Sequence, residues 1–580
     1  MSEIVVAQRP TPGTPRPYHF PPFDRRRLAN GLDILTVDLP GRPLLSAELV
    51  FRYGAADEPD DAAGATVLAA RALSEGTRSR DAIELTESAE RLGASLHAEA
   101  GWDSVVAGVT VPAERLLPAL ELLAEMVLEP AFPEAEVDRL RDERLNDLLQ
   151  ARADPRRRGE EEFARAIYRG SPYGRPAGGT RETVARLDRD RVEGAWARWF
   201  DPSHATLIVG GDISGVDVEQ IARQLFGAWE RHPAAVTGGA VAATSAVKSR
   251  FVRVLHRPGS VQTEIRIGHP GVARRTPDFH AVAVASAILG GLFNSRLNMK
   301  LREEKGYTYG ASASFDVRRA AGPFGARAAV NTEVTVPAVR DMLAELDRIR
   351  AAEVAPEELT AARDFLVGIF PLRFETPGAV VGALAGLVAL GLPDDELSRY
   401  RPLVEAVDAP AVLAAARAHI RPDRAAVVLV GDADRFGADL EAAGIGPVTV
   451  ERDDATLTVT GSLPAGLAGT YLRNGPNPKF EPKGRYHIFD GDGMLHGLTL
   501  DGAGGASYRN RWVRTAGLAV EERLGRAVYG GMANGEFPSP EETGGGPSMK
   551  NVANTNVIRH AGRILALWEA GPPTEVSPLL

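Results

Sequence analysis

An arginine and a tyrosine, Arg302 and Tyr309, stand seven residues apart within the segment 290–310. A tyrosine hydroxyl can donate a hydrogen bond to a developing oxyanion, and a guanidinium can hold a peptide carbonyl group. In the plainer alternative, Arg302 pairs with the adjacent Glu303 or Glu304, and Tyr309 belongs to the core of a strand. Spacing alone favours that alternative, so a catalytic interpretation depends on the surrounding sequence.

Other catalytic patterns are missing from the sequence. The chain has no cysteine, which excludes thiol nucleophiles, thiolate metal ligands and disulfides. It also has no Gly-x-x-x-x-Gly-Lys phosphate loop and no Gly-x-Ser-x-Gly nucleophile elbow. Isolated histidines on predicted strands and helices are expected to be hydrogen-bonded structural residues, and six of them are His97, His204, His256, His269, His280 and His419.

Composition predicts a multidomain globular protein of 580 residues, with 44% hydrophobic and 25% charged residues. No apolar run is long enough to span a bilayer, and the net charge of -10 argues against a nucleic-acid partner. The N-terminus lacks the pattern of a secretory signal, so we expect a cytoplasmic protein. Residues 1–23 are rich in proline and predict a mobile or surface-wrapping arm, with a disordered leader preferred.

The elements that must position these side chains follow an α+β pattern. Asn30-Gly31 is a strong turn signal and predicts that a β-hairpin opens the folded part. Apolar periodicity then predicts strands at 47–53, 95–98 and 105–111, and helices at 61–74, 81–93, 113–128 and 134–151. The charged run 156–162 predicts a solvated helix face with i,i+4 pairs.

An internal echo divides the chain. Residues 421–432 are similar in sequence to residues 201–212, and each copy predicts a short apolar strand ending in Gly-Asp. The echo predicts two related domains, residues 24–232 and 248–440, joined by the linker 233–247. Residues 456–580 differ in character, since short strands with closely spaced turns predict an all-β segment.

Residues 24–440 resemble the insulinase and pitrilysin family of zinc peptidases. In the first half the resemblance rests on the segments 28–32, 52–59, 64–77 and 91–96, and in the second on 290–310. It implies two α/β sandwich domains that close around an extended peptide. Matching the family's His-x-x-Glu-His motif places Val67, Ala70 and Arg71 at the catalytic positions, and Asp147 at that of the third ligand. None of the first three can bind zinc, and a lone Asp147 is expected to be a solvated helix charge.

The resemblance gives Arg302 and Tyr309 the roles of binding the substrate peptide and stabilising the transition state. Some members of this family divide their functions between a chain with zinc ligands and a chain with the Arg/Tyr pair, and this sequence is similar to the second kind. We therefore expect an inactive zinc site, no cofactor in this chain, and a heterodimer with a zinc-bearing partner that cleaves an extended peptide. A non-catalytic peptide-binding or assembly protein of the same fold is the alternative.

Residues 456–580 resemble the opening of a carotenoid cleavage oxygenase, and the matching segments are 473–480, 486–497, 508–515 and 551–571. The resemblance implies part of a β-propeller whose four iron-binding histidines would follow Leu580. Glu569 matches a glutamate that orients one of those histidines. A carotenoid dioxygenase is thus the third and weakest alternative, and the segment is either a fusion or truncation product or a retained appendage.

Overall fold

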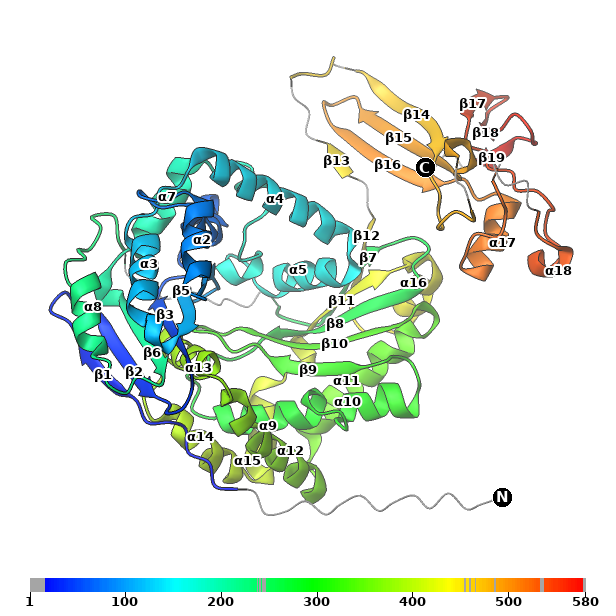
Figure 1. Cartoon of the computed structure of the whole chain (residues 1–580). Helices are drawn as coiled ribbons and strands as arrows, with labels where there is room; N and C mark the ends of the chain where they lie inside the picture. The colour runs from blue at the N-terminus through cyan, green and yellow to red at the C-terminus, as the bar shows by residue number, and fades with distance from the viewer. Residues whose placement is uncertain are drawn as a thin grey trace, which may run out of the picture. The chain divides into compact units, whose positions relative to one another are not determined.

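The computed structural model describes residues 16–236, 238, 241, 247–452, 455–457, 461–464, 466–484, 487–531 and 537–576. Two compact units, Met1–Val450 and Glu451–Leu580, make up the chain (Figure 1). The first unit is mixed α/β and contains both halves of the sequence echo. The second is rich in β-strands. Each unit is considered by itself.

The first half of unit 1 is built on a six-stranded sheet. Its strands, in spatial order, are β1 (Asp24–Arg27), β2 (Asp33–Asp38), β6 (Ala205–Gly211), β3 (Leu44–Phe51), β5 (Val105–Pro112) and β4 (Ser95–Ala100). β1 and β2 form the hairpin predicted from Asn30-Gly31, and Gly31 has a φ of 95°. β2 and β6 are parallel, whereas the other neighbours in this sheet are antiparallel.

The second half repeats this sheet. Its order is β12 (Val448–Arg452), β7 (Phe251–His256), β11 (Ala426–Gly431), β8 (Gln262–Pro270), β10 (Pro323–Asn331) and β9 (Ala311–Phe315). β7 and β11 form the parallel pair that corresponds to β2 and β6. The two echo segments fall on β6 and β11, which are fully buried central strands. The echo in the sequence therefore marks the strand that closes each half.

Helices cover one face of each sheet. In the first half they are α1 (Ala65–Ala72), α2 (Ala82–Arg91), α3 (Leu116–Leu128), α4 (Glu134–Ala153), α6 (Arg181–Val184), α7 (Arg189–Trp199) and α8 (Val218–Phe226). In the second half they are α9 (Phe279–Ser286), α10 (Arg296–Asn298), α11 (Thr335–Ala351), α12 (Pro356–Ile369), α14 (Glu396–Glu405), α15 (Ala409–His419) and α16 (Ala433–Ala442). The predicted helix 61–74 is shorter in the structure, because Gly64, with a φ of 97°, precedes its first turn.

The other face of each sheet is covered by a helix from the opposite half. Helix α5 (Pro155–Ile167) belongs to the first half but packs on β8 and β11, while α13 (Pro377–Leu390) belongs to the second half and packs on β3 and β6. Glycines on the sheets permit the close approach. A Cβ at Gly210 would lie 2.7 Å from Val381 of α13, and one at Gly268 would lie 2.8 Å from the Phe163 ring of α5.

The loop between β9 and β10 also joins the halves. Arg319 forms an ion pair of 2.7 Å with the buried Asp57, and its backbone N–H donates to Asp103. Arg318 lies over the rings of Trp102 and Tyr173, at 4.9 and 4.7 Å from their centroids. These contacts tie the end of the second sheet to the first half.

The N-terminal arm is ordered where the structure describes it. Phe20 is buried, and Tyr18 stacks on Phe374 with 6.2 Å between the ring centroids. The preferred prediction of a disordered leader is therefore wrong for this part of the arm, which wraps the surface through its aromatic side chains. Residues 1–15 lie outside the described part of the chain.

The described part of unit 2 contains two antiparallel sheets. One has the order β13 (Ala455–Leu457), β16 (Ala506–Trp512), β15 (Gly493–Asp501) and β14 (Ala468–Pro476), and the other is formed by β17 (Asn556–His560), β18 (Arg563–Leu567) and β19 (Thr574–Val576). Two helices, α17 (Ala516–Leu524) and α18 (Pro540–Thr543), interrupt the strands. The all-β prediction for this segment therefore holds for its sheets but missed both helices.

Among the described residues, no single helix has the length and apolar composition needed to cross a bilayer. One pair, Pro356–Phe374 with Pro377–Leu390, passes that test only together and is bent by 114°. The apolar side chains of α13 that give this result face the first sheet.

The exchange of helices predicts that α13 stabilises the half to which it does not belong. Leu384 is fully buried against Leu35 and Ile208, so Leu384→Ala should lower the free energy of unfolding by about 2–5 kcal/mol. Leu372→Ala is the matched control, because Leu372 is 65% exposed and its truncation should cost less than about 0.5 kcal/mol. Guanidinium denaturation of the full chain measures both, and equal midpoints would contradict the packing argument.

Candidate functional site

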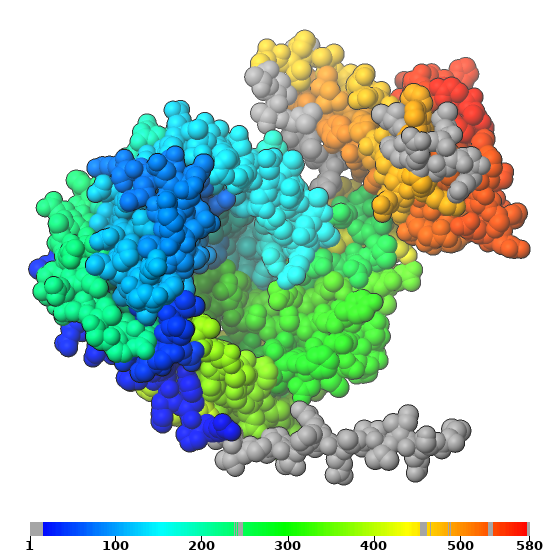
Figure 2. Space-filling view, viewed as in Figure 1, coloured from blue at the N-terminus to red at the C-terminus, as the bar shows by residue number. Residues whose placement is uncertain are grey.

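The positions predicted for chemistry lie beside one edge strand of each sheet in unit 1, β4 in the first and β9 in the second. Helix α1, which carries Val67, Ala70 and Arg71, packs against the edge strand β4. In the second half, the π-helical segment η6 (Ala287–Gly291) and α10 pack against the edge strand β9. Figure 2 shows the unit hollowed between the cyan helices of the first half and the green second half. An edge strand offers unpaired N–H and C=O groups to an extended peptide.

The three catalytic-motif positions on α1 contain no metal-binding group. Ala70 is fully buried, Val67 is half-buried, and Arg71 projects to the surface. The Arg71 guanidinium lies 3.0 Å from Glu143 of α4. Glu143 also pairs with Arg139, which contacts Glu75 at 2.7 Å. A network of guanidinium and carboxylate groups thus replaces the arrangement that could hold a cation.

Asp147 is ion-paired, not merely solvated as the sequence predicted. Arg157 of α5 approaches it with two nitrogens, at 2.7 and 2.9 Å, and Arg144 of α4 forms a further hydrogen bond. The hydrogen bonds from Arg157 hold the pKa of Asp147 below its usual value, and the charges of both arginines act in the same direction. The carboxylate at the position predicted for the third ligand is therefore paired with protein cations.

The charged run at the start of α5 is also less exposed than predicted. Glu162 is buried, and its carboxylate lies 2.8 Å from Arg253 and 3.0 Å from Arg165. The expected i,i+4 contact between Arg156 and Glu160 is long, at 3.9 Å. The prediction of a solvated, i,i+4-paired face therefore holds for Arg156 and Glu160 but is wrong for Glu162, because α5 covers the sheet of the opposite half, which sequence periodicity cannot indicate.

Arg302 and Tyr309 lie on the second half, near the start of β9. Arg302 is part of the π-helical turn η7 (Met299–Glu304), a geometry often found at functional sites. Its guanidinium lies 3.4 Å from Glu303 and 4.7 Å from the centre of the Phe293 ring. Tyr309 is 92% exposed and precedes β9 by two residues, so the alternative that placed it in a strand core is wrong.

The inner face of the first sheet carries a cluster that sequence reasoning missed. Glu48 of β3 and His97 of β4 flank Gly108 of β5, whose missing side chain leaves room for both. Burial, with a smaller effect from Glu99, raises the pKa of Glu48 to about 7. Burial also lowers the pKa of His97. The signal in the sequence is a glycine inside a strand, which often marks a close approach.

A second cluster consists of buried His256 and Asp432 with exposed Asp434, whose ligand atoms lie within 4.8 Å of one another. The Ala433 N–H donates to Nδ1 of His256, and the Gly259 N–H donates to Asp432. The first half repeats the last contact, where the Gly41 N–H donates to Asp212. We therefore assign Asp432 a structural role in joining a loop to the end of the closing strand.

In unit 2, Glu569 accepts a hydrogen bond of 2.8 Å from the Thr555 hydroxyl. This is the position at which the sequence resemblance implied a contact with a ligand histidine. His496, in another of the matched segments, contacts the Tyr508 hydroxyl. Both polar side chains are therefore held by neighbours in the same unit.

Three family models match the chain. Residues 34–181 match the insulinase (peptidase family M16) model, residues 186–366 match the peptidase M16 inactive domain, and residues 445–579 match the retinal pigment epithelial membrane protein (RPE65) model. The two M16 models together match more than half of the chain. The resemblances to both families inferred from the sequence are thereby confirmed.

Two curated relatives illustrate the two parts. An uncharacterized zinc protease of Streptomyces coelicolor is 26% identical and aligns with 62% of this chain and 79% of its own length. A carotenoid cleavage oxygenase of Mycobacterium tuberculosis is 47% identical over 22% of this chain, which spans only 23% of that protein.

Two solved structures share the fold. A peptidase M16 inactive domain from Pseudomonas fluorescens has a TM-score of 0.66 and 24% identity, and the match covers 70% of this chain and 98% of that one. A protease from Helicobacter pylori has a TM-score of 0.67 and 17% identity, and the match covers 71% of this chain and all of that one.

The environment of Glu48 predicts a pH dependence of stability. Its pKa of about 7 in the folded state exceeds the usual 4.5, so the folded chain binds more protons, and stability falls as pH rises from about 4.5 through 7. Glu48→Gln should remove up to about 3 kcal/mol of this pH-dependent fall in the free energy of unfolding. Urea unfolding at pH 5 and pH 8 measures the effect. Glu87→Gln, at an exposed position on α2, is the control, and an equal effect of both substitutions would contradict the assignment.

Proposed function

We propose, from the premise that residues 34–366 belong to the insulinase (M16) peptidase family, that this chain is the non-zinc subunit of a two-chain peptidase. In this role it would bind an extended peptide and stabilise the transition state, while a partner chain of the same family would supply the zinc ion. The observation that carries the proposal is the contrast between the two halves. The positions that the sequence resemblance assigns to zinc ligands on α1 hold side chains that cannot bind a metal ion, whereas the arginine and tyrosine that it assigns to the second half are present beside an edge strand.

The exposure of the pair supports this role. Tyr309 has 92% of its surface accessible, and Phe293 and Met299 beside Arg302 are also exposed. Large apolar side chains that are exposed in this way are typical of a surface that contacts another molecule. A peptide paired with β9 would run close to Tyr309, since Tyr309 leads directly into that strand.

The chemistry assigned to the pair is electrostatic. The Tyr309 hydroxyl would donate to the oxyanion that forms when a peptide carbonyl is attacked, and the Arg302 guanidinium would hold a neighbouring carbonyl group. A zinc ion bound by the partner would polarise the carbonyl group that is attacked, and it would supply the attacking water. Two relatives of this chain are described as zinc proteases, which supports a peptidase assembly as the context.

For unit 2 we propose the fold of the opening part of a carotenoid oxygenase propeller, without an oxygenase activity of its own. The match to the RPE65 model and the two antiparallel sheets support this assignment. Because the chain spans 23% of the matched oxygenase, the activity of that protein is not carried over.

The first test mixes the chain with an M16 subunit that has an intact His-x-x-Glu-His motif, such as one encoded by a neighbouring gene. Peptide hydrolysis should appear only in the mixture. Tyr309→Phe should lower kcat by about 10²–10³, the usual loss of an oxyanion donor, with little change in KM. Tyr307→Phe is the matched control, because Tyr307 packs partly buried against the core two residues away.

The outcomes separate the two remaining functions. A non-catalytic assembly protein would form the complex, observed by size-exclusion chromatography, and would retain the activity of the mixture when Tyr309 is changed. Absence of a complex, or equal effects of the Tyr307 and Tyr309 substitutions, would refute the subunit role.

The second test concerns the metal. Since Val67 and Ala70 offer no ligand and Arg71 and Asp147 are paired with opposite charges, the isolated chain should bind no zinc on α1. A ligand that binds the folded state raises the melting temperature. Differential scanning calorimetry should therefore give the same Tm with zinc and with a chelator. A zinc-dependent rise that Asp147→Asn abolishes would contradict the proposed loss of the site.

A further inference from the structure

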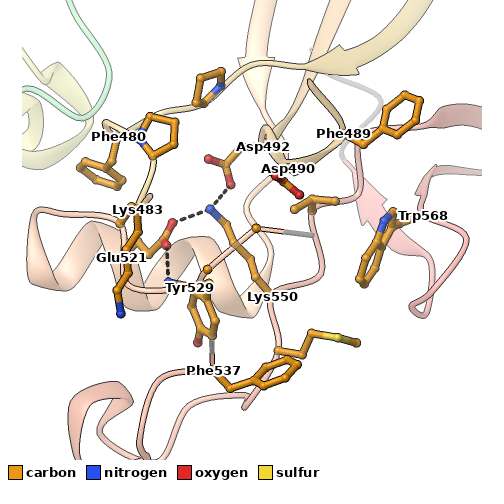
Figure 3. Close-up of a pocket in the computed structure, with 17 residues that line it drawn as sticks. Phe480, Lys483, Phe489, Asp490, Asp492, Glu521, Tyr529, Phe537, Lys550 and Trp568 are labelled. Carbon is orange, nitrogen blue, oxygen red and sulfur yellow. Dashed lines mark hydrogen bonds and ion pairs between the residues drawn. The ribbon is translucent and has the colours of Figure 1, made fainter. Parts of the chain in front are cut away.

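The buried charges that line a pocket of about 250 Å³ in unit 2 are paired with one another (Figure 3). The ammonium group of Lys550 lies 2.6 Å from Asp492 and also contacts Glu521, as the dashed lines show. Glu521 also accepts the backbone N–H groups of Val528 and Tyr529. This cluster therefore holds unit 2 together and does not select a charged ligand.

On the second sheet of unit 1, Arg327 of β10 has no such close ion pair. Its side chain is half exposed, and within the described part of the chain the one carboxylate within 4.0 Å is Glu160 of α5. That contact, from Nη1, measures 3.9 Å, which is too long for a hydrogen bond. Glu160 is also shared, since it lies 3.8 Å from Arg266 and 3.9 Å from Arg156.

The Arg327 side chain reaches from β10 to the edge strand β9. Arg327 and Ser312 are directly opposite in the register of the two strands, so their side chains share a face of the sheet. Nε of Arg327 donates a hydrogen bond of 2.9 Å to Oγ of Ser312. In a guanidinium the Nε–H bond and one Nη2–H bond are parallel, so Nη2 is directed toward β9 as well.

Two hydrogen-bond donors remain for a ligand at this edge. Among the described residues, Nη2 of Arg327 makes no hydrogen bond, and the Ser312 hydroxyl accepts one but donates none. A carboxylate is an acceptor that takes two such hydrogen bonds side by side. Arg327 and Ser312 thus form a half-exposed carboxylate site beside the free edge of the second sheet.

A peptide that pairs with β9 would bring one of its side chains to these donors. Residues directly opposite on paired strands have Cβ atoms about 4.5–5.5 Å apart on the same face. The peptide residue opposite Ser312 would therefore lie beside both donors. Ser312 follows Tyr309 by three residues, or about 10 Å of extended chain, so this position lies about three residues from the cleaved bond.

We propose that Arg327 and Ser312 make the chain selective for peptides with an aspartate or glutamate at this position. The inference rests on the proposed function, because it requires that an extended peptide pairs with β9. An asparagine would satisfy the hydrogen bonds without the charge, and a lysine would be repelled by the guanidinium. The selectivity is moderate, because water and salt screen a half-exposed ion pair.

Fluorescence anisotropy of the full chain, without a partner, tests this selectivity. The probes are nine-residue peptides of serine, threonine and valine with a neutral fluorophore and with aspartate, asparagine or lysine at the central position. At low ionic strength the aspartate peptide should bind about three- to tenfold more tightly than the asparagine peptide, and the lysine peptide should bind most weakly. Equal binding of the aspartate and asparagine peptides, or tighter binding of the lysine peptide, would overturn the inference.

Substitutions on the two strands locate the selectivity. Arg327→Gln should abolish the preference for aspartate but change the affinity for the asparagine peptide less than about twofold, a separation that a merely structural role would not produce. Ser312→Ala should reduce the preference in part, because one donor remains. Arg340→Gln is the matched control, since Arg340 is exposed on α11, which covers the other face of this sheet. An undiminished preference in Arg327→Gln, or an equal loss in Arg340→Gln, would refute the site.

The outcomes also separate this inference from the proposed function. Peptide binding without a preference would leave the peptide-binding role intact and refute the selectivity alone. A preference for aspartate without hydrolysis in the mixture with a zinc-bearing subunit would support the selectivity and refute only the catalytic role. If none of the three peptides binds at millimolar concentration, both proposals are wrong.

Discussion

The reciprocal cover of the two sheets is the constraint on which unit 1 depends. Each sheet would expose an apolar face if its own half stood alone, because a helix from the other half packs on that face, α13 on β3 and β6 and α5 on β8 and β11. Hydrophobic burial of this kind is the main favourable contribution to folding. The halves therefore stabilise one another, and the hollow between them is bounded by elements with a fixed relative position.

The two halves of unit 1 share one architecture but differ in the side chains beside their edge strands. Both sheets have the same strand order, with one parallel pair at the same place. In each half this order positions an edge strand, β4 or β9, and the helical segments beside it. In the first half the polar groups near the edge are satisfied internally, as Arg71 is by Glu143. In the second half Tyr309 remains exposed. An exposed donor can still serve a ligand.

Much of this architecture could be predicted from the sequence. Local signals sufficed where structure is local: Asn30-Gly31 located the first hairpin, and the echo located the closing strands β6 and β11. Packing across long sequence distances could not be predicted in this way. The charged run 156–162 gives no indication that α5 packs on a distant sheet, and the proline-rich arm gives none that its aromatic side chains pack on the second half, so the burial of Glu162 and Phe20 was not predicted.

At the candidate site, too, some features could be predicted from the sequence and others required the structure. That Val67 and Ala70 cannot bind a metal ion follows from residue type alone, whereas the roles predicted for Arg302 and Tyr309 depend on the sequence resemblance. The pairing of Asp147 required the structure, since its partner Arg157 lies on a different helix. Because α5 also covers the second sheet, that ion pair connects α4 to the helix that joins the two halves. The Asp147 carboxylate is thus part of the scaffold, and its removal would loosen the attachment of α4 to that joint.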